Sequence, residues 1–166
     1  MDAWRLSGRM GGSHGMTEMK KYFTNKKYGG YSDCICNGEL KHPWWNGAVI
    51  SNCTGFCWGM FNMARGTKDK FKRLYGNAGT LYAAGKKNGS GFLVGYEPKA
   101  DAIAVYGAGT KAGHVVYLLH NFGSGHFIGL ESNCSGSYSN ALALRVKYGD
   151  PKHWYKEYKG CIYDFT

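Results

Sequence analysis

The chain has 166 residues, of which 43% are hydrophobic and only 19% are charged, and this composition excludes a disordered chain. Its length is typical of one domain with a sizeable core. The formal net charge of +10 is compatible either with an anionic partner, such as nucleic acid, anionic lipid or an anionic cell-wall polymer, or with a role in solubility alone.

The first 15 residues show no hydrophobic period and precede Met16, so we expect residues 1–15 to be a tag or a disordered leader. Residues 16–166 contain no internal repeat and no Pro- or Ser-rich linker, and we expect them to form a single domain. The sequence shows no apolar stretch near the roughly 18 residues that span a membrane, and no apolar core of a secretory signal. We therefore expect no stable membrane insertion.

The first clear pattern is a helical one. Apolar or small residues recur at the spacing of one buried helix face, namely Cys53, Phe56, Cys57, Met60, Phe61 and Ala64. Ser51 and Asn52, just before this run, are residue types favoured at a helix N-cap. The pattern predicts an amphipathic helix over residues 53–64 with Cys53 at its beginning.

Two shorter helical segments are predicted over residues 67–76 and 77–87, where Gly or Lys marks each C-terminal end. After Gly89 the hydrophobic period changes from 3.6 to 2, which predicts short strands separated by turns. These strands are expected within residues 91–96, 101–107, 114–122, 126–132, 141–149 and 161–165. Helices followed by an antiparallel sheet define an α+β domain.

Cys53 has the position of an activated thiol. The partial positive charge at a helix N-terminus favours the thiolate form of a cysteine. A cysteine nucleophile also needs an imidazole to exchange protons and a third polar group to orient that imidazole. His114 begins a predicted strand, and Glu131 and Asn133 follow on the next one, so these three residues are the candidates.

Six cysteines occur in the chain, namely Cys34, Cys36, Cys53, Cys57, Cys134 and Cys161. A chain of this length needs no disulfides for stability, so we expect reduced thiols. The spacings of Cys34 with Cys36 and of Cys53 with Cys57 depart from those of zinc-binding cysteine pairs. We therefore expect neither a structural metal nor a cofactor.

Three segments follow one another along the chain, NCTGFCWG at residues 52–59, DAIAVYGAGTKAGHVVYL at 101–118 and LESN at 130–133. The first resembles the Cys-Thr-x-Tyr-Ala-x-Gly nucleophile motif of the CHAP domains, the cysteine, histidine-dependent amidohydrolases/peptidases of phage endolysins and bacterial wall hydrolases. The second resembles that family's strand leading into Gly-His-Val, and the third its Glu-x-Asn segment. The resemblance covers roughly residues 46–165 and extends to the closing strand.

The resemblance implies a papain-like fold of the NlpC/P60 type, with a nucleophile helix packed on an antiparallel sheet. It makes Cys53 the nucleophile, His114 the general base and then acid, and Glu131 the group that orients His114. Asn133 matches the family's nearby Asn, with a supporting or alternative orienting role. Substrate-binding candidates are Trp44, Trp45 and Asn52; the two tryptophans precede the helix, where they would hold a glycan or peptide or pack in the core.

The chain departs from the family pattern at three places. Cys57 stands where a small residue such as Ala is common, and its place on the buried helix face indicates a packed side chain. Met60 replaces a common Arg, which leaves the contact made by that Arg without a counterpart. Residues 41–52 contain no Asp or Glu, so we expect no calcium site of the kind that some members form there.

These observations predict a peptidoglycan hydrolase that cleaves an amide through a Cys-His-Glu thiol mechanism, as an N-acetylmuramoyl-L-alanine amidase or an endopeptidase. Its expected partners are peptidoglycan and anionic wall polymers, with a monomer favoured. We expect a phage endolysin that reaches the wall from the host cytoplasm after release by a holin, or that acts when applied from outside. The alternatives are a non-catalytic wall-binding module, a small-molecule amidase of the same fold, and a nucleic-acid-binding module, for which no RNP, KH, helix-turn-helix or zinc-finger pattern is present.

Overall fold

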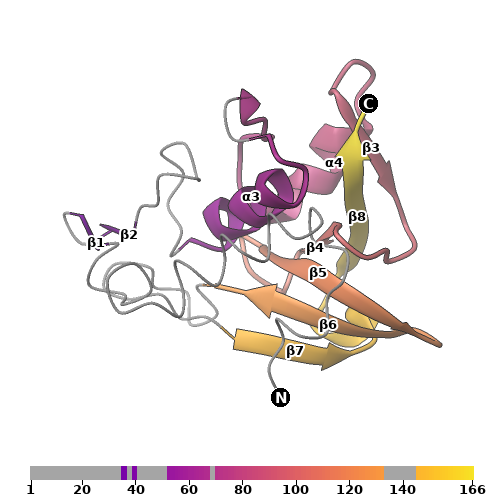
Figure 1. The fold of residues 1–166 in the computed structure, drawn as a ribbon. Helices are drawn as coiled ribbons and strands as arrows, with labels where there is room; N and C mark the ends of the chain where they lie inside the picture. Colours follow the sequence, from indigo (N-terminus) through magenta and orange to yellow (C-terminus); the bar gives the residue numbers. More distant parts are fainter. Residues whose placement is uncertain (1–34, 37–38, 41–51, 68–69, 133–144) are drawn as a thin grey trace.

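The computed structural model describes residues 35–36, 39–40, 52–67, 70–132 and 145–166 (Figure 1). Its helices are α3 (Cys53–Ala64), α4 (Leu81–Lys86) and the single-turn 3-10 helices η4 (Ala78–Thr80) and η5 (Pro151–His153). Its strands are β1 (Ile35–Cys36), β2 (Glu39–Leu40), β3 (Phe92–Gly95), β4 (Ile103–Tyr106), β5 (His114–Gly123), β6 (His126–Glu131), β7 (Arg145–Gly149) and β8 (Tyr158–Phe165). The predictions for residues 1–15 lie outside this described part.

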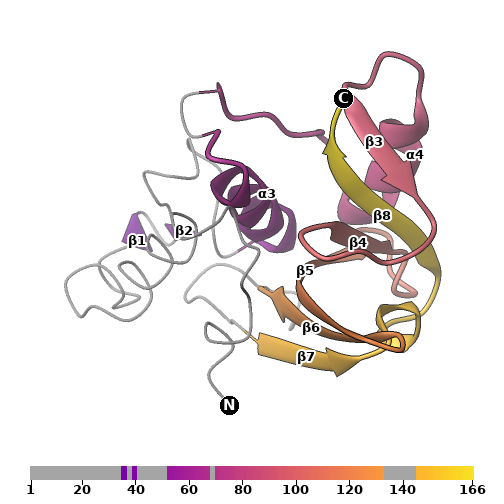
Figure 2. The ribbon, with the colours of Figure 1, turned by 45° about the vertical axis from the view of Figure 1, so that its right-hand side comes forward.

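A six-stranded sheet forms the centre of the described fold, with the strand order β3-β8-β4-β5-β6-β7. Every neighbouring pair in it is antiparallel. Figure 2 shows α3 on one side of the sheet and α4 beside β3 and β8. The domain is therefore α+β, as the change of hydrophobic period predicted.

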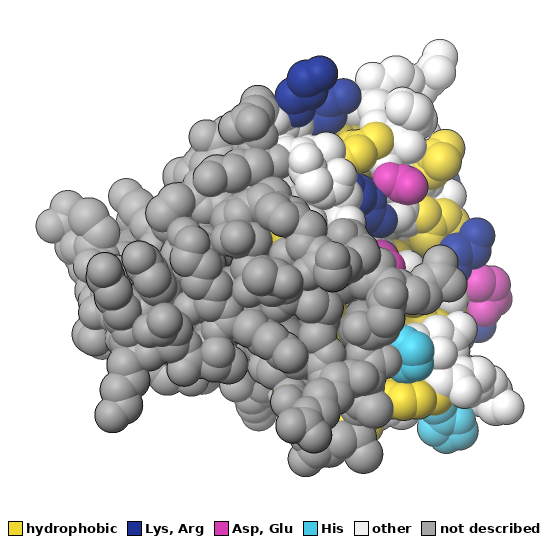
Figure 3. Space-filling view, viewed as in Figure 1, with side chains coloured by type: hydrophobic (Ala, Val, Ile, Leu, Met, Phe, Trp, Pro, Cys, Tyr) yellow, Lys and Arg dark blue, Asp and Glu magenta, His cyan; other side chains and the backbone are white. Residues whose placement is uncertain are grey.

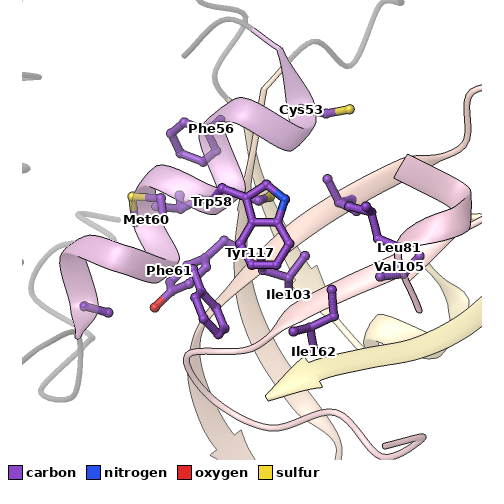
Figure 4. Packing of buried hydrophobic residues seen from close by; sticks show 14 of the residues in the cluster. Cys53, Phe56, Trp58, Met60, Phe61, Leu81, Ile103, Val105, Tyr117 and Ile162 are labelled. Atoms are coloured by element: carbon purple, nitrogen blue, oxygen red, sulfur yellow. The ribbon is translucent and has the colours of Figure 1, made fainter. Parts of the chain in front are cut away.

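Helix α3 spans the predicted residues and begins at Cys53, with Asn52 as its N-cap. Its burial extends beyond the predicted face, because every residue of the helix except Thr54 is buried. Trp58 and Phe61 pack against Phe92. Figure 4 shows Trp58 and Phe61 on the side of α3 that faces the sheet. A helix that is apolar on nearly all sides is an interior helix rather than an amphipathic surface one.

The segment that follows α3 differs from its prediction, since residues 71–76 are not helical. Here the buried side chain of Asn62 makes two hydrogen bonds to the backbone of Lys72. The Asn62 Nδ2 atom donates to the Lys72 carbonyl oxygen (2.9 Å), and the Asn62 Oδ1 atom accepts from the Lys72 N–H (3.0 Å). Thr67 donates its hydroxyl to the same Asn62 oxygen at 2.7 Å. These bonds hold an extended segment against the helix, so tertiary contacts override the helical propensity of residues 67–76.

Arg65, the C-cap of α3, connects the helix to the sheet. Its guanidinium donates to the carbonyl oxygens of Phe61, Asp101 and Tyr163 at 3.0, 2.9 and 2.6 Å. It also pairs with Asp164 at 2.9 Å and lies 3.5 Å from the centre of the Phe61 ring. One side chain therefore joins the end of the helix, the approach to β4 and the last strand.

The other face of the sheet is also covered. Tyr106, Val116, Leu118 and Phe127 are buried there, with Trp154 packed against the cluster that they form. Gly129 makes room for that tryptophan, because a Cβ at this position would lie 2.7 Å from the Trp154 ring. The central strands are therefore apolar on both faces. None of the described helices is long and apolar enough to cross a membrane.

Candidate active site

Cys53 is the first residue of α3, and only 8% of its surface is exposed. The Asn52 side chain accepts a long hydrogen bond (3.4 Å) from the N–H of Thr54, and the Asn52 carbonyl accepts the first helical bond, from Phe56 (2.8 Å). Figure 4 shows Cys53 at the start of the helix, at the edge of the packed cluster. The thiol thus lies where a helix N-terminus stabilises negative charge.

His114 is the first residue of β5 and pairs with Tyr106 on β4. The preceding residue, Gly113, has φ +72°, and a Cβ there would lie 2.5 Å from the Cα of Gly79 and 2.6 Å from the carbonyl oxygen of Tyr106. No side chain fits into this space without moving backbone atoms. The glycine of the Gly-His sequence is therefore required to bring β5 close to η4, and this approach fixes where His114 begins its strand.

Glu131 is the last residue of β6 and is completely buried. Tyr117 pairs with Leu130, and continuing this register places Glu131 next to Val116, two residues from His114 on the same face. The Oε2 atom of Glu131 lies 2.9 Å from Nε2 of His114. This bond occupies one ring nitrogen of His114 and leaves Nδ1 as the ring nitrogen for the thiol.

The charge of His114 follows from its surroundings. Burial by itself would lower the pKa of the imidazole, but hydrogen bonds to Cys53 and Glu131, together with electrostatic interactions with the same two groups, outweigh it and raise the pKa to about 9. The imidazole is therefore protonated at neutral pH. A thiolate next to an imidazolium is the form in which a cysteine attacks a carbonyl carbon and the histidine supplies the proton to the leaving group.

Tyr155 also belongs to this cluster, although the sequence analysis did not single it out. Its hydroxyl lies 2.8 Å from each of the two Glu131 carboxylate oxygens. Its ring meets the His114 ring edge-on, with 4.9 Å between the ring centres. Tyr155 lies between η5 and β8, in a segment without helical or strand periodicity, so no local pattern pointed to it.

The structure thus brings together three of the predicted site residues, Cys53, His114 and Glu131. Asn52 lies next to them as the N-cap of α3. The other candidates, Trp44, Trp45 and Asn133, lie outside the described residues.

Two of the three departures from the family motif are core positions, and the third, at residues 41–52, lies almost entirely outside the described residues. Cys57 and Met60 are completely buried, and no disulfide joins Cys53, Cys57 and Cys161, the cysteines with described side chains. Within the described ranges, no group of three or more His, Cys, Asp or Glu side chains is arranged to hold a metal ion. The chemistry that this arrangement offers is acyl transfer through a thiol.

A comparison with protein-family models identifies the class of protein. The family model described as "CHAP domain" matches residues 43–133, which is more than half of the chain and includes Cys53, His114 and Glu131. The chain therefore belongs to the CHAP domain family. Tyr155 lies beyond the matched residues.

Solved structures with similarity to the chain include the crystal structure of Ly7917, with 16% sequence identity, a TM-score of 0.46, and coverage of 79% of this chain and 57% of that one. Another is an N-acetylmuramoyl-L-alanine amidase from Staphylococcus aureus, with 14% identity, a TM-score of 0.45, and coverage of 87% and 45%. The chain spans about half the length of these proteins. None of the curated proteins compared with the chain matches it.

Proposed function

We propose that this protein is a peptidoglycan hydrolase that cleaves an amide bond of the bacterial wall, with Cys53 as nucleophile, His114 as acid and base, and Glu131 as the residue that orients His114. The observation that carries this proposal is the buried contact of His114 with both Glu131 and the helix-terminal Cys53. Membership of the CHAP domain family supports it. The cut bond is either the amide between the sugar and the stem peptide or one within the peptide.

In the first half of the reaction, the thiolate of Cys53 attacks the carbonyl carbon of the scissile amide and forms a tetrahedral intermediate. The N–H groups at the start of α3, including that of Cys53, stabilise the oxyanion. Collapse of this intermediate breaks the C–N bond, and His114 gives its proton to the departing amine. The product of this step is a thioester between the substrate acyl group and Cys53.

In the second half, neutral His114 takes a proton from a water molecule, which attacks the thioester carbonyl carbon. The second tetrahedral intermediate collapses, the C–S bond breaks, and a carboxylic acid leaves. Cys53 returns to the thiolate and His114 to the imidazolium. Throughout the cycle Glu131 holds Nε2, so that Nδ1 stays directed towards the sulfur.

For substrate binding we propose Trp44, Trp45 and Asn52, and for Asn133 a role in support of His114. The net charge of +10 favours binding to anionic wall polymers. On the described face in Figure 3, Lys and Arg side chains lie at separate places with Asp and Glu between them. This dispersed charge fits long-range attraction to a polyanion better than one specific anion site.

We also propose that residues 16–166 act as one catalytic domain of a phage endolysin, a role that rests on the motif resemblance. An endolysin made inside a bacterium needs the membrane to be opened before it meets its substrate. Cells that express the protein should therefore lyse only after the membrane has been permeabilised, for example by chloroform. Lysis of expressing cells without this treatment would contradict the proposed route.

The test of the activity is the fall in turbidity of purified Gram-positive walls under reducing conditions, with the intact protein, Cys53→Ala and Cys57→Ala. We expect lysis by the intact protein and by Cys57→Ala, because Cys57 packs in the core, and no lysis by Cys53→Ala. Mass spectrometry of the released fragments then identifies the cut bond.

Three outcomes would contradict this proposal. Lysis that survives Cys53→Ala would exclude the thiol mechanism. Equal binding of walls by the intact protein and Cys53→Ala, without lysis by either, would indicate a binding module. Cleavage of small amides but not of walls would indicate a small-molecule amidase.

A further inference from the structure

We propose that Tyr155 is a positioning residue of the active site, which acts by fixing the Glu131 carboxylate so that one of its oxygens faces His114. The inference rests on the proposed function for its meaning in catalysis. The effect of the Tyr155 hydroxyl on the His114–Glu131 pair can be measured without any substrate, as a change in the pKa of His114.

The contacts of the Tyr155 hydroxyl carry the proposal. It lies 2.8 Å from both oxygens of Glu131, so the single O–H points into the fork of the carboxylate. A carboxylate held from this side can rotate only by losing that contact. Since Oε2 is also 2.9 Å from Nε2 of His114, the hydroxyl and the imidazole together determine the orientation of the Glu131 side chain.

The Tyr155 ring adds a second constraint on the same histidine. Its edge-on contact with the His114 ring, at an interplanar angle of 68°, restricts the rotation of the imidazole. The Tyr155 ring is itself fixed by an edge-on contact with Tyr106, with 5.4 Å between the ring centres. One tyrosine thus contacts the base through its ring and the orienting carboxylate through its hydroxyl.

The charged and titratable groups around this pair come from several elements. The groups that interact with His114 or Glu131 are Cys53 from α3, Tyr106 from β4 and Tyr155 itself. Lys147 from β7 lies over the Tyr155 ring, with its Nζ 4.9 Å from the ring centre. Within this set the Tyr155 hydroxyl donates directly to the carboxylate. Its removal therefore changes the hydrogen bonding of Glu131 without changing the net charge of the site.

The expected effect of Tyr155→Phe follows from the burial of Glu131. A completely buried carboxylate depends on its donors, so loss of one donor makes its ionised form less favourable and frees it to rotate. His114 then loses part of the interaction that raises its pKa. We expect the pKa of His114 to fall below its value of about 9. We also expect kcat to fall about ten- to a hundredfold with KM unchanged, because the loss of one hydrogen bond to a charged group has an effect of this size.

The experiment compares the intact protein, Tyr155→Phe, Glu131→Gln and the double variant. The His114 titration is followed by NMR, and kcat and KM are measured on solubilised peptidoglycan fragments. If Tyr155 acts through Glu131, Tyr155→Phe will lower the pKa of His114 and kcat in the otherwise intact protein. In the Glu131→Gln background the same substitution will change neither the pKa of His114 nor kcat further. An unchanged His114 titration in Tyr155→Phe, or equal effects in both backgrounds, would overturn the proposal.

Tyr106→Phe is the matched control. It removes a buried hydroxyl from the same aromatic cluster, one that donates to the Pro151 carbonyl and not to Glu131. Tyr106→Phe should lower the stability of the protein but leave the pKa of His114 unchanged. If the pKa of His114 shifts as much in Tyr106→Phe as in Tyr155→Phe, the effect is one of general packing and the proposal is overturned. If the intact protein lyses no walls, the proposed function fails, while the titration still decides the role of Tyr155.

Discussion

Glu131 and His114 show how two buried groups stabilise each other at the scale of single residues. A buried carboxylate costs free energy unless it is hydrogen-bonded and faces a positive charge. Glu131 has both, because His114 and Tyr155 contact its oxygens. The same contacts that make the imidazole cationic therefore also stabilise the folded protein.

The stability of the protein should depend on pH through His114. The folded pKa of about 9 exceeds the ordinary 6.5, so His114 stabilises the fold fully below pH 6.5 and loses this contribution as the pH rises towards 9. The change amounts to about 3 kcal/mol. Urea unfolding at several pH values should show this decrease in the intact protein and not in His114→Asn; parallel curves for the two proteins would contradict the prediction.

At the scale of elements, the start of β5 depends on a glycine. We expect Gly113→Ala to destabilise the protein by roughly 3 kcal/mol or more and to lower activity. The positive φ of Gly113 disfavours alanine, and the added Cβ would collide with the backbone of Gly79 and Tyr106. Thermal unfolding and wall lysis measure the two effects.

Gly109→Ala is the matched control for this prediction. Gly109 lies in the same connection at φ +66°, but its added Cβ would meet only the Lys156 side chain, at an ordinary 3.7 Å. This variant should lose only about 1 kcal/mol and keep its activity. Similar losses for the two variants would mean that the close approach of β5 to η4 is unimportant.

The end of α3 gives a second prediction at this scale. Arg65→Ala should destabilise the protein by about 3 kcal/mol, because it leaves the carbonyl oxygens of Phe61, Asp101 and Tyr163 without this donor. Arg73→Ala is the control, since the described contact of Arg73 is with the ring of Tyr75, which is largely exposed. Chemical denaturation should separate the two variants by at least about 1 kcal/mol, and equal midpoints would refute the role of Arg65.

For the whole molecule, the net charge of +10 predicts that wall lysis weakens as salt is added. Raising the ionic strength shortens the range of attraction to an anionic polymer, to about 8 Å at 0.15 M. Lysis rates measured between 50 and 500 mM NaCl should fall severalfold, while thermal stability changes little. A rate independent of salt would show that the excess of Lys and Arg serves no binding role.

The sequence predicted α3 and the strand on which His114 lies because their signals are local. The N-cap and the helical spacing of α3 lie within residues 52–64, and the alternation of β5 lies within His114–Gly123. Residues 71–76 were predicted wrongly because the deciding contact comes from Asn62, on another element. Tyr155 was missed for the same reason, since its partner Glu131 lies 24 residues earlier in the chain.

The connection between β5 and β6 has a consequence for how the site assembles. His114 and Glu131 lie at the open end of one hairpin, whose turn contains Ser124 and Gly125 in the left-handed region. Such a hairpin needs only local chain closure, whereas Cys53 reaches it across some sixty residues when α3 docks on the sheet. Before α3 docks on the sheet, Cys53 is not yet beside His114, so we expect the proposed hydrolase activity to appear only after the helix has packed.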